Sequence, residues 1–210
     1  MALRVVVVDD HAFTRSTVSA SLRQNKFDVV AEVENAFDAV QAVVNEKPDA
    51  IVIDLNLGDG PSGIDLARGL RKNHPNLGIV ILTSYADPRL FSDDLPDLPA
   101  GAQYLVKQDL GDAEELADAV NASVGLPSKK PIDPESRLPL TDSQTDVFRL
   151  LAEGLSNSEI AKRRGVKEKA VEQTLGRIAK RLEVQTDGTT NLRAQLVKTF
   201  YRLTGSQRGR

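Results

Sequence analysis

The sequence contains no cysteine and no tryptophan, and only two of its 210 residues are histidines, His11 and His74. Without cysteine there is no disulfide scaffold, thiolate metal site or cysteine nucleophile. Two histidines leave little room for a zinc enzyme or a histidine-based catalytic triad. No apolar run approaches the roughly 20 residues that cross a bilayer, and no signal peptide is visible. These absences predict a cytoplasmic protein with no membrane partner.

Charge is distributed unevenly, although the net value is only −3. Residues 1–126 carry 20 Asp and Glu against 10 Lys and Arg, a formal charge of −10. Residues 127–210 carry 10 Asp and Glu against 17 Lys and Arg, a formal charge of +7. The asymmetry favours an acidic module joined to one that could bind nucleic acid. Charge alone is equally compatible with two ordinary solvated surfaces.

The first part of the chain alternates short apolar runs with amphipathic stretches. The runs are rich in β-branched residues and predict strands at Leu3–Val8, Val29–Val33, Ala50–Ile53, Ile79–Leu82 and Tyr104–Val106. Continuous rather than alternating apolar runs are typical of parallel strands that are buried on both faces. Helical spacing lies between them, as in Ala36–Asn45, Gly63–His74 and Ala113–Val124. The alternation predicts a doubly wound α/β domain with five parallel strands over residues 1–125.

Prolines interrupt the chain in two places. Pro88, Pro96 and Pro99 leave space for only a short helix over Arg89–Leu95, before the last strand. Residues 126–138 contain three more prolines among serines and lysines. Such a segment resists both helix and sheet, so it predicts a semi-rigid linker.

Residues 139–210 carry helix signals only. Thr141 with Gln144, and Ser156 with Glu159, fit the capping box, in which each side chain satisfies the other residue's backbone N–H. The expected helices are Asp142–Glu153, Asn157–Arg164, Glu168–Leu182 and about Thr190–Leu203. Two short helices followed by a longer one are typical of a helix-turn-helix, here in an all-α domain of four helices.

The third of these helices has an apolar face and a polar face. Lysine and arginine on the polar face could neutralise DNA phosphates, Gln173 could read a base edge, and Gly176 could allow a close approach. A small bundle with a solvated basic face is the alternative interpretation. The candidate DNA-binding residues are Lys167, Lys169, Glu172, Gln173, Gly176, Arg177 and Lys180.

Five polar residues lie at the carboxyl ends of predicted strands: Asp9, Asp10, Asp54, Thr83 and Lys107. Ligands of doubly wound sheets bind beyond these ends. Three carboxylates brought together repel one another unless a cation joins them, and oxygen ligands suit Mg²⁺. One carboxylate could form an acyl phosphate, with the hydroxyl and the ammonium holding the phosphoryl oxygens.

Each of these residues also has a simpler interpretation. Asp10 could cap the helix that starts near Ala12, Asp54 could begin a turn, and Lys107 could be a solvated charge. His11 is expected to be a surface or capping residue. The placement of all five polar residues at strand ends nevertheless favours a phosphoryl-binding site.

In this order, the polar residues make the chain over about residues 3–124 resemble the receiver domain of two-component response regulators. The resemblance implies that Asp54 accepts a phosphoryl group from a sensor histidine kinase. Thr83 and Lys107 match the residues that sense this group, and Tyr104 matches the aromatic switch position. The implied Mg²⁺ ligands are Asp9, Asp10, Asp54 and the backbone carbonyl of Asn56. The loop Leu55–Ser62 departs from the pattern, because it lacks Met-Pro and is one residue longer.

The second part of the chain resembles the LuxR-type DNA-binding domain over about residues 138–203. The resemblance rests on Leu140-Thr141, on the run Leu151–Ala161, and on the apolar residues that follow it. The whole chain is therefore similar to NarL/FixJ-type response regulators, which implies double-stranded DNA as a partner and a homodimer in the active state. Glu172 and Thr174 depart from the pattern, where lysine and histidine are usual.

Three functions follow from these features. The first is a response regulator in which phosphorylation of Asp54 controls DNA binding and transcription. The second is a phospho-dependent adaptor whose C-terminal domain binds protein and has lost specific DNA recognition, as Glu172 would suggest. The third, a phosphohydrolase, needs an acid/base aspartate two residues past the nucleophile, where this chain has Asn56. We therefore expect no enzyme.

Overall fold

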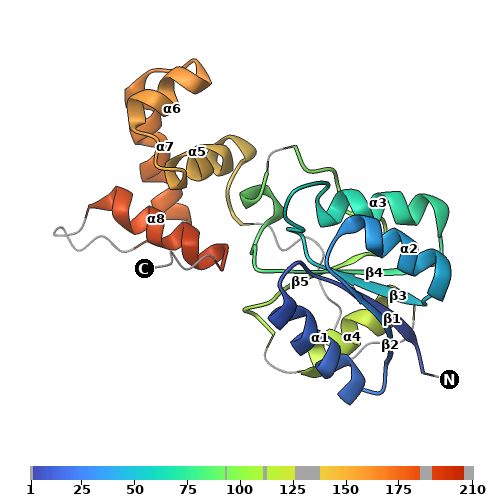
Figure 1. The fold of residues 1–210 in the computed structure, drawn as a ribbon. Helices are drawn as coiled ribbons and strands as arrows, with labels where there is room; N and C mark the ends of the chain where they lie inside the picture. Colours follow the sequence, from blue (N-terminus) through green and yellow to red (C-terminus); the bar gives the residue numbers. More distant parts are fainter. Residues whose placement is uncertain (1, 93, 111–112, 126–137, 185–190, 206–210) are drawn as a thin grey trace. The chain divides into compact units, whose positions relative to one another are not determined.

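The computed structural model describes residues 2–92, 94–110, 113–125, 138–184 and 191–205, and it confirms the predicted fold class (Figure 1). A five-stranded parallel sheet with helices is followed by an all-helical domain. No helix in these ranges is long and apolar enough to cross a membrane. The predicted linker, apart from Leu138, lies outside the described residues.

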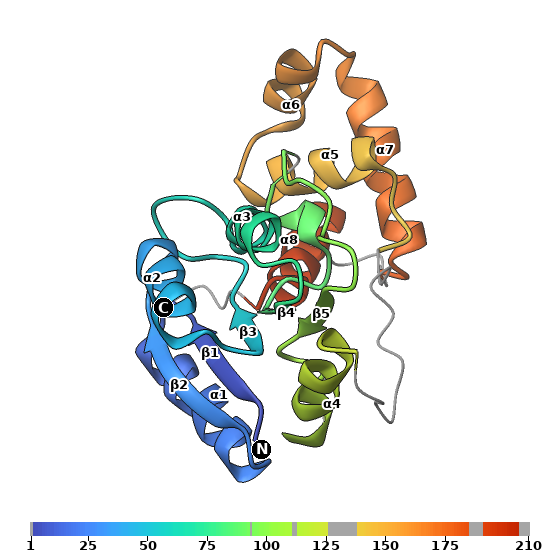
Figure 2. The same ribbon diagram turned by 90° about the vertical axis from the view of Figure 1, so that its right-hand side faces the viewer.

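The sheet has the strand order β2-β1-β3-β4-β5, which runs from one edge to the other in Figure 2. The strands are β1 (Arg4–Val8), β2 (Asp28–Val33), β3 (Ala50–Ile53), β4 (Gly78–Thr83) and β5 (Gln103–Val106). Every residue of β3 and β4 is buried, which explains why their sequences are continuously apolar. All five predicted strands are present, each within one residue of its predicted start and end.

Two layers of helices enclose the sheet, with α2 and α3 on one face and α1 and α4 on the other (Figure 1). Their bounds are α1 (Ala12–Gln24), α2 (Ala36–Glu46), α3 (Gly63–Asn73) and α4 (Ala113–Ser123). The α1 and α4 layer packs its apolar side chains, such as Leu22 and Val120, against Val7 and Val80 of the sheet. A capping box between Ser62 and Asp65 fixes the start of α3.

The connection between β4 and β5 differs from the prediction. Its described residues contain a single 3-10 turn, η1 (Pro88–Leu90), in place of a short helix over Arg89–Leu95. Pro88 begins the turn, and the Asp87 carboxylate accepts the N–H of Arg89 at 2.9 Å. Pro96 and Pro99 lack the N–H that a continuing helix would need, so the chain stays irregular as far as β5.

The helical domain contains α5 (Asp142–Ala152), α6 (Asn157–Arg164), α7 (Glu168–Arg181) and α8 (Leu192–Leu203). Both predicted capping boxes are present, at Thr141 and Ser156. Gly165 ends α6 in the left-handed conformation, with φ of 66°. Phe148 is fully buried at the centre of the helices, where its ring meets Phe200 edge-to-face at 5.2 Å.

The chain forms two compact units whose bounds do not follow its linear order. The first unit comprises Met1–Thr83 and Leu95–Glu135, and the second comprises Ser84–Asp94 and Ser136–Arg210. Leu90 of η1 is 2% exposed and belongs to the same apolar core as the side chains of α5–α8. Part of the β4–β5 connection therefore completes the helical unit, which the sequence pattern did not predict.

Candidate functional site

Hydrogen bonds between neighbouring strands set the positions of the predicted pocket residues. The N–H of Asp54 donates to the carbonyl of Val8 at 2.9 Å, which aligns the end of β3 with the end of β1. The N–H of Lys107 donates to the carbonyl of Thr83 at 2.7 Å and aligns β5 with β4 in the same way. The parallel register therefore brings four of the predicted residues to the carboxyl-terminal end of the sheet: Asp9, Asp54, Thr83 and Lys107.

Lys107 joins two carboxylates in this pocket. Its Nζ lies 2.7 Å from Oδ2 of Asp9 and 3.3 Å from Oδ2 of Asp54. Both aspartates are buried, with exposed fractions of 3% and 7%. One ammonium between two buried carboxylates leaves an excess of negative charge. The pocket is therefore suited to a further cation.

Burial raises the pKa of Asp54 from 3.8 to about 6, an effect that the Lys107 charge opposes and the Asp9 carboxylate reinforces. Its Oδ1 also accepts the N–H of Leu55 at 2.9 Å, which orients the carboxylate. At neutral pH the Asp54 carboxylate is ionised, and Lys107 neutralises only part of its charge. Those are the properties of a carboxylate that can act as a nucleophile.

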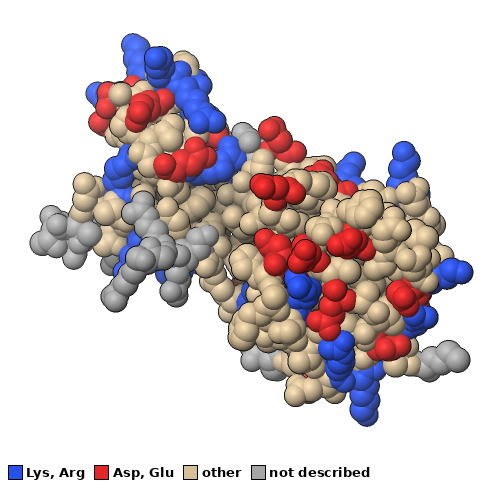
Figure 3. Space-filling model, in the orientation of Figure 1, with Lys and Arg blue, Asp and Glu red and all other residues tan. Residues whose placement is uncertain are grey.

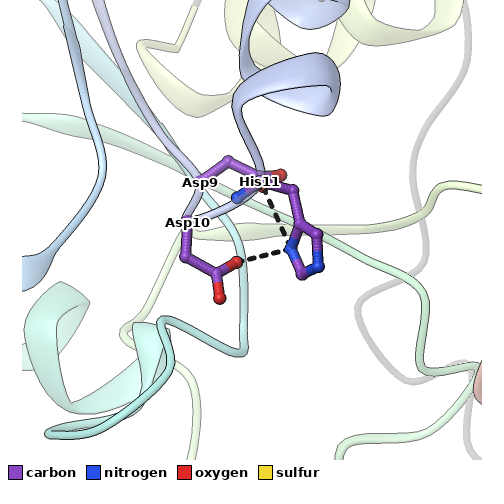
Figure 4. A group of neighbouring side chains, drawn as sticks. All are labelled: Asp9, Asp10 and His11. Carbon is purple, nitrogen blue, oxygen red and sulfur yellow. Dashed lines mark hydrogen bonds and ion pairs between the residues drawn. The ribbon is translucent and has the colours of Figure 1, made fainter.

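Asp10 and His11 lie beside Asp9 at the start of α1 (Figure 4). Nδ1 of His11 lies 2.7 Å from Oδ1 of Asp10, and the His11 N–H donates to Oδ1 of Asp9 at 2.9 Å. His11 itself occupies the N-cap position and is mostly exposed, so Asp10 does not cap the helix. The interpretation of Asp10 as a simple helix cap is therefore wrong.

The oxygen donors of the pocket fit a hard divalent cation. Ligand atoms of Asp9, Asp10 and His11 all lie within 4.8 Å of one another, two of them carboxylate oxygens and the third an imidazole nitrogen. The side-chain oxygen of Asn56 accepts the N–H of Gly58 at 3.2 Å, so its amide serves the turn. The predicted metal ligand at Asn56 is the backbone carbonyl, so metal binding does not disturb the hydrogen bond between the Asn56 side chain and Gly58. Carboxylate and carbonyl oxygens are the donors that Mg²⁺ prefers.

Thr83 and Tyr104 lie on the two strands that end at this pocket. Thr83 pairs with Val106 and Tyr104 with Ile81, so the two residues lie on neighbouring strands. Both side chains are buried in the described state. A movement of either side chain therefore requires its surroundings to adjust, because protein interiors are close-packed.

Two further residues support the pocket and were not among the predicted site residues. A Cβ added to Gly63 would lie 2.1 Å from the carbonyl oxygen of Asp54, so the start of α3 passes directly over the Asp54 backbone. Arg15 donates from Nη1 to the carbonyl of Asp9 at 2.5 Å. A glycine at the first position of an amphipathic helix was a usable signal for close approach, whereas nothing in the sequence marked Arg15.

In the second unit, α7 presents the predicted DNA-binding face to solvent. Val171, Leu175 and Ile178 are buried in the core. Thr174 donates its hydroxyl to the carbonyl of Ala170 at 2.8 Å, so this side chain is engaged by its own helix. A Cβ on Gly176 would meet nothing within 4 Å, so packing does not require a glycine there. All seven predicted contact residues are exposed: Lys167, Lys169, Glu172, Gln173, Gly176, Arg177 and Lys180.

Arginines on α6, α7 and α8 bind other residues of their own unit. Arg164 pairs with Asp146 of α5, Arg181 donates to the carbonyl of Pro139 at 3.1 Å, and Arg193 donates to Asn157 Oδ1 at 3.0 Å. These bonds join α6, α7 and α8 to other parts of the unit. Lysine and arginine side chains also gather on the surface around α6, where Lys162 and Arg163 are exposed (Figure 3).

Comparisons with known proteins cover both units. Residues 5–121 match the response regulator receiver domain, and residues 138–189 match the luxR family of bacterial regulatory proteins. The chain is 32% identical over 198 residues to the DNA-binding transcriptional activator DevR/DosR of Mycobacterium tuberculosis, covering 87% of this chain and 89% of that protein. It is 30% identical to the response regulator VraR of Staphylococcus saprophyticus, covering 88% and 92%. The two-component response regulator RcsB, solved in complex with DNA, has a similar fold, with a TM-score of 0.59 at 24% identity over 97% of this chain and 100% of that one.

Proposed function

Because the chain belongs to the response regulators that join a receiver domain to a LuxR-type DNA-binding domain, we propose that a sensor histidine kinase phosphorylates Asp54. This phosphorylation controls the binding of the C-terminal domain to double-stranded DNA, and thereby transcription. The protein acts in the cytoplasm, where it can reach both kinase and DNA, and it is a homodimer when active.

The position of Asp54 beside Lys107 is the observation that carries this proposal. A buried carboxylate with a raised pKa, 3.3 Å from an ammonium, combines a nucleophile with a charge that can stabilise the transferred group. A carboxylate that merely began a turn would need neither its burial nor the shared ammonium. The pocket thus supports phosphoryl acceptance better than a structural role.

In the transfer, a carboxylate oxygen of Asp54 attacks the phosphorus of a phosphohistidine. The bond from phosphorus to the histidine nitrogen breaks as the acyl phosphate forms. Lys107 compensates the charge that develops on the phosphoryl oxygens. A Mg²⁺ held by Asp9, Asp10, Asp54 and the Asn56 carbonyl supplies, when bound, further neutralisation of these oxygens.

The phosphoryl group itself carries roughly 1.5 to 2 negative charges at neutral pH, and these replace the single charge of the Asp54 carboxylate. Lys107 is within reach of this charge, and Thr83 ends the neighbouring strand with a hydroxyl that can donate to it. Inward movement of Thr83 changes the packing beside Tyr104 on β5. These three residues are thus the proposed route from the phosphoryl group to the rest of the protein.

DNA binding relies on the exposed face of α7. Four exposed cations on this face can neutralise phosphates: Lys167, Lys169, Arg177 and Lys180. The hydrogen bonds that hold the unit together use other cations, such as Arg181 and Arg193. Gln173 and Glu172 can read base edges, because glutamine pairs with adenine and a carboxylate accepts from the amino group of cytosine. The bare surface at Gly176 allows the helix backbone to approach the groove.

Binding to genomic DNA fragments tests the proposal, with and without acetyl phosphate and Mg²⁺. We expect selective binding that strengthens on phosphorylation of the wild type and of Asp59→Ala, a matched loss of an exposed carboxylate. Asp54→Ala should bind without this strengthening. Selective binding that ignores the phosphodonor in the wild type would contradict control through Asp54.

The adaptor is the second candidate, favoured by the exposed carboxylate of Glu172 on the DNA-binding face. A salt titration on duplex DNA separates the two functions, because phosphate contacts give affinity a steep negative dependence on salt. Absence of any selective binding, in either phosphorylation state, would favour the adaptor.

A further inference from the structure

Helix α2 of the receiver unit carries a group of exposed apolar side chains. Among the described residues five large apolar side chains are exposed, and three of them lie on this helix: Phe37 at 73%, Val40 at 41% and Val44 at 53%. Their spacing of three and four residues places them on one face, whereas the buried Ala39 and Ala42 lie on the other. We call these three exposed residues the α2 stripe. A contiguous apolar group of this kind marks a surface that another molecule covers.

A cavity of about 710 Å³ opens beside one end of the α2 stripe. Val44 lines the cavity, together with Pro48 after the end of α2 and with Pro75 and Leu77 between α3 and β4. These residues precede β3 and β4, so the cavity lies at the end of the sheet opposite to the phosphoryl pocket. Its apolar walls are suited to an apolar side chain, and no residue of the phosphoryl pocket lines it.

The α2 stripe and the cavity complement each other. Phe37 projects from the helix seven residues before Val44, so about 10 Å along the helix axis separates its ring from the edge of the cavity. When two copies of α2 lie antiparallel, Phe37 of each copy lies opposite Val44 of the other and can enter the cavity beside it. This two-fold contact uses both rings and both cavities, so it closes as a dimer and leaves nothing for a third copy.

The charges at the two ends of α2 fit the same arrangement. Glu34 lies three residues before Phe37, and Lys47 lies three residues after Val44. Both charged side chains are exposed, and neither has an ion-pair partner among the described residues. The antiparallel pairing places Glu34 of each copy opposite Lys47 of the other. A parallel pairing would instead bring like charges together, so charge selects the antiparallel arrangement.

We propose that a second copy of this chain docks on the α2 stripe, in an antiparallel two-fold contact between two receiver units. The proposed function includes a dimer in the active state but assigns no surface to it. The α2 contact goes beyond that function, because it uses no residue of the phosphoryl pocket and forms whether or not Asp54 is phosphorylated.

The absence of cysteine makes a crosslinking test direct. In the antiparallel pairing the two-fold axis passes between Val40 and Gln41, so the exposed Gln41 of each copy lies near its counterpart. We expect full-length Gln41→Cys to form a covalent dimer under mild oxidation. Lys72→Cys places a cysteine at an exposed position of α3, away from this axis, and is the matched control. Crosslinking of both variants at the same rate would overturn the contact.

Sedimentation equilibrium of the full-length protein, without a phosphodonor, measures the contribution of the ring. We expect Phe37→Ala to weaken self-association at least tenfold, because a two-fold contact loses a central aromatic side chain twice. Phe13→Ala removes an equally exposed ring from α1 and should leave the dissociation constant unchanged. Self-association of Phe37→Ala at the strength of the wild type would contradict docking on α2.

Reversal of the charges tests the register. Glu34→Lys and Lys47→Glu each bring like charges together at both ends of the pair, so each variant should associate more weakly than the wild type. The double variant restores opposite charges and should recover most of the lost affinity. Because a folding defect would not be repaired in this way, the recovery identifies a contact between the two residues. A double variant that stays as weak as the single variants would overturn the antiparallel pairing.

The outcomes separate this contact from the proposed function, since none of these measurements needs a phosphoryl group or DNA. A wild-type protein that stays monomeric at all concentrations would overturn the α2 contact and leave phosphorylation of Asp54 and DNA binding to be judged by their own tests. A dimer that forms as described, in a protein that takes up no phosphoryl group, would support the α2 contact while the proposed function fails.

Discussion

Lys107 lies closer to Asp9 than to the proposed phosphoacceptor, with 2.7 Å between its Nζ and Oδ2 of Asp9. The shorter contact shows that its ammonium mainly balances Asp9 in the described state. A cation bound at Asp9 would compete with this contact and leave Lys107 free to turn toward Asp54, 3.3 Å away. The ammonium is thus placed to serve two partners in succession.

We predict that Lys107→Ala destabilises the metal-free protein at pH 7 by roughly 1–3 kcal/mol, because two buried carboxylates lose their shared partner. Mg²⁺ should recover part of this loss, since it supplies the missing positive charge. Urea unfolding with and without Mg²⁺ measures both effects. Lys72→Ala, which removes an exposed ammonium from α3, should change stability little. An equal loss in the two variants would argue against the pairing in the pocket.

Stability should depend on pH through Asp54. Its pKa is about 6 in the folded protein, against 3.8 ordinarily, so the folded state holds the proton more tightly. The ionised carboxylate therefore costs nothing below pH 4, and its cost grows from pH 4 to 6. Above pH 6 it reaches roughly 3 kcal/mol. Asp54→Asn imitates the neutral form and should gain stability over the wild type across this window.

Urea unfolding in chelator-treated buffer between pH 4.5 and 7.5 measures the difference between Asp54→Asn and the wild type. Asp59→Asn removes an exposed carboxylate and should follow the wild type. A difference that stays constant across this range would exclude a raised pKa at Asp54.

Two glycines of α3 provide a matched pair. Gly63→Ala forces a Cβ against the backbone of Asp54, so we expect a loss of about 1–3 kcal/mol and slower phosphoryl uptake. Gly69→Ala meets nothing within 4 Å and should stabilise the helix by about 0.5–1 kcal/mol. Urea unfolding and acetyl phosphate uptake distinguish the two. Equal behaviour would mean that the contact at Gly63 is relieved without consequence.

Gly176 lies in a helix where alanine fits without any contact. We therefore expect Gly176→Ala to stabilise the DNA-binding domain by about 1 kcal/mol and yet to weaken DNA binding, because the added methyl group holds the helix away from the groove. Thermal unfolding and a DNA titration measure the two effects. If binding is unchanged, the glycine has no role in the approach to DNA.

Arg177→Ala should weaken binding to all DNA sequences and reduce the salt slope of affinity by about one, as expected for a phosphate contact. Glu172→Lys should have the opposite effect on the slope and raise non-specific affinity. Lys198→Ala, an exposed cation on α8, should leave the slope unchanged. Slopes that do not respond to either substitution on α7 would remove this helix from the DNA interface.

Much of the fold could be predicted because its signals are local. The strands are continuously apolar. The capping boxes at Thr141 and Ser156 each span only four residues of sequence, and each marks the start of a helix. The pocket could be predicted as well, although Asp9 and Lys107 are 98 residues apart, because parallel strands bring their carboxyl ends to one edge. Strands are parallel when helices connect them, and the alternation of apolar runs with amphipathic stretches predicts this topology.

The assignment of Ser84–Asp94 to the helical unit could not be predicted by the same means. Asp87 and Leu138 are 51 residues apart and lie in elements that no periodicity connects. The prolines between β4 and β5 correctly indicated that helix would be scarce, but they carry no information about where Leu90 is buried. Tertiary packing decides contacts such as the one between Asp87 and Leu138. The same is true of the arginine contacts between helices, such as Arg164 with Asp146.

The position of Leu90 also constrains how the protein is made. Leu90 leaves the ribosome well before Phe148 and Leu151, with which it shares a core. When the receiver emerges, the other side chains of this core have therefore not yet been synthesised. The helices in turn cannot complete that core without a segment of the earlier domain. The apolar core of the second unit is therefore assembled from segments that are synthesised at different times.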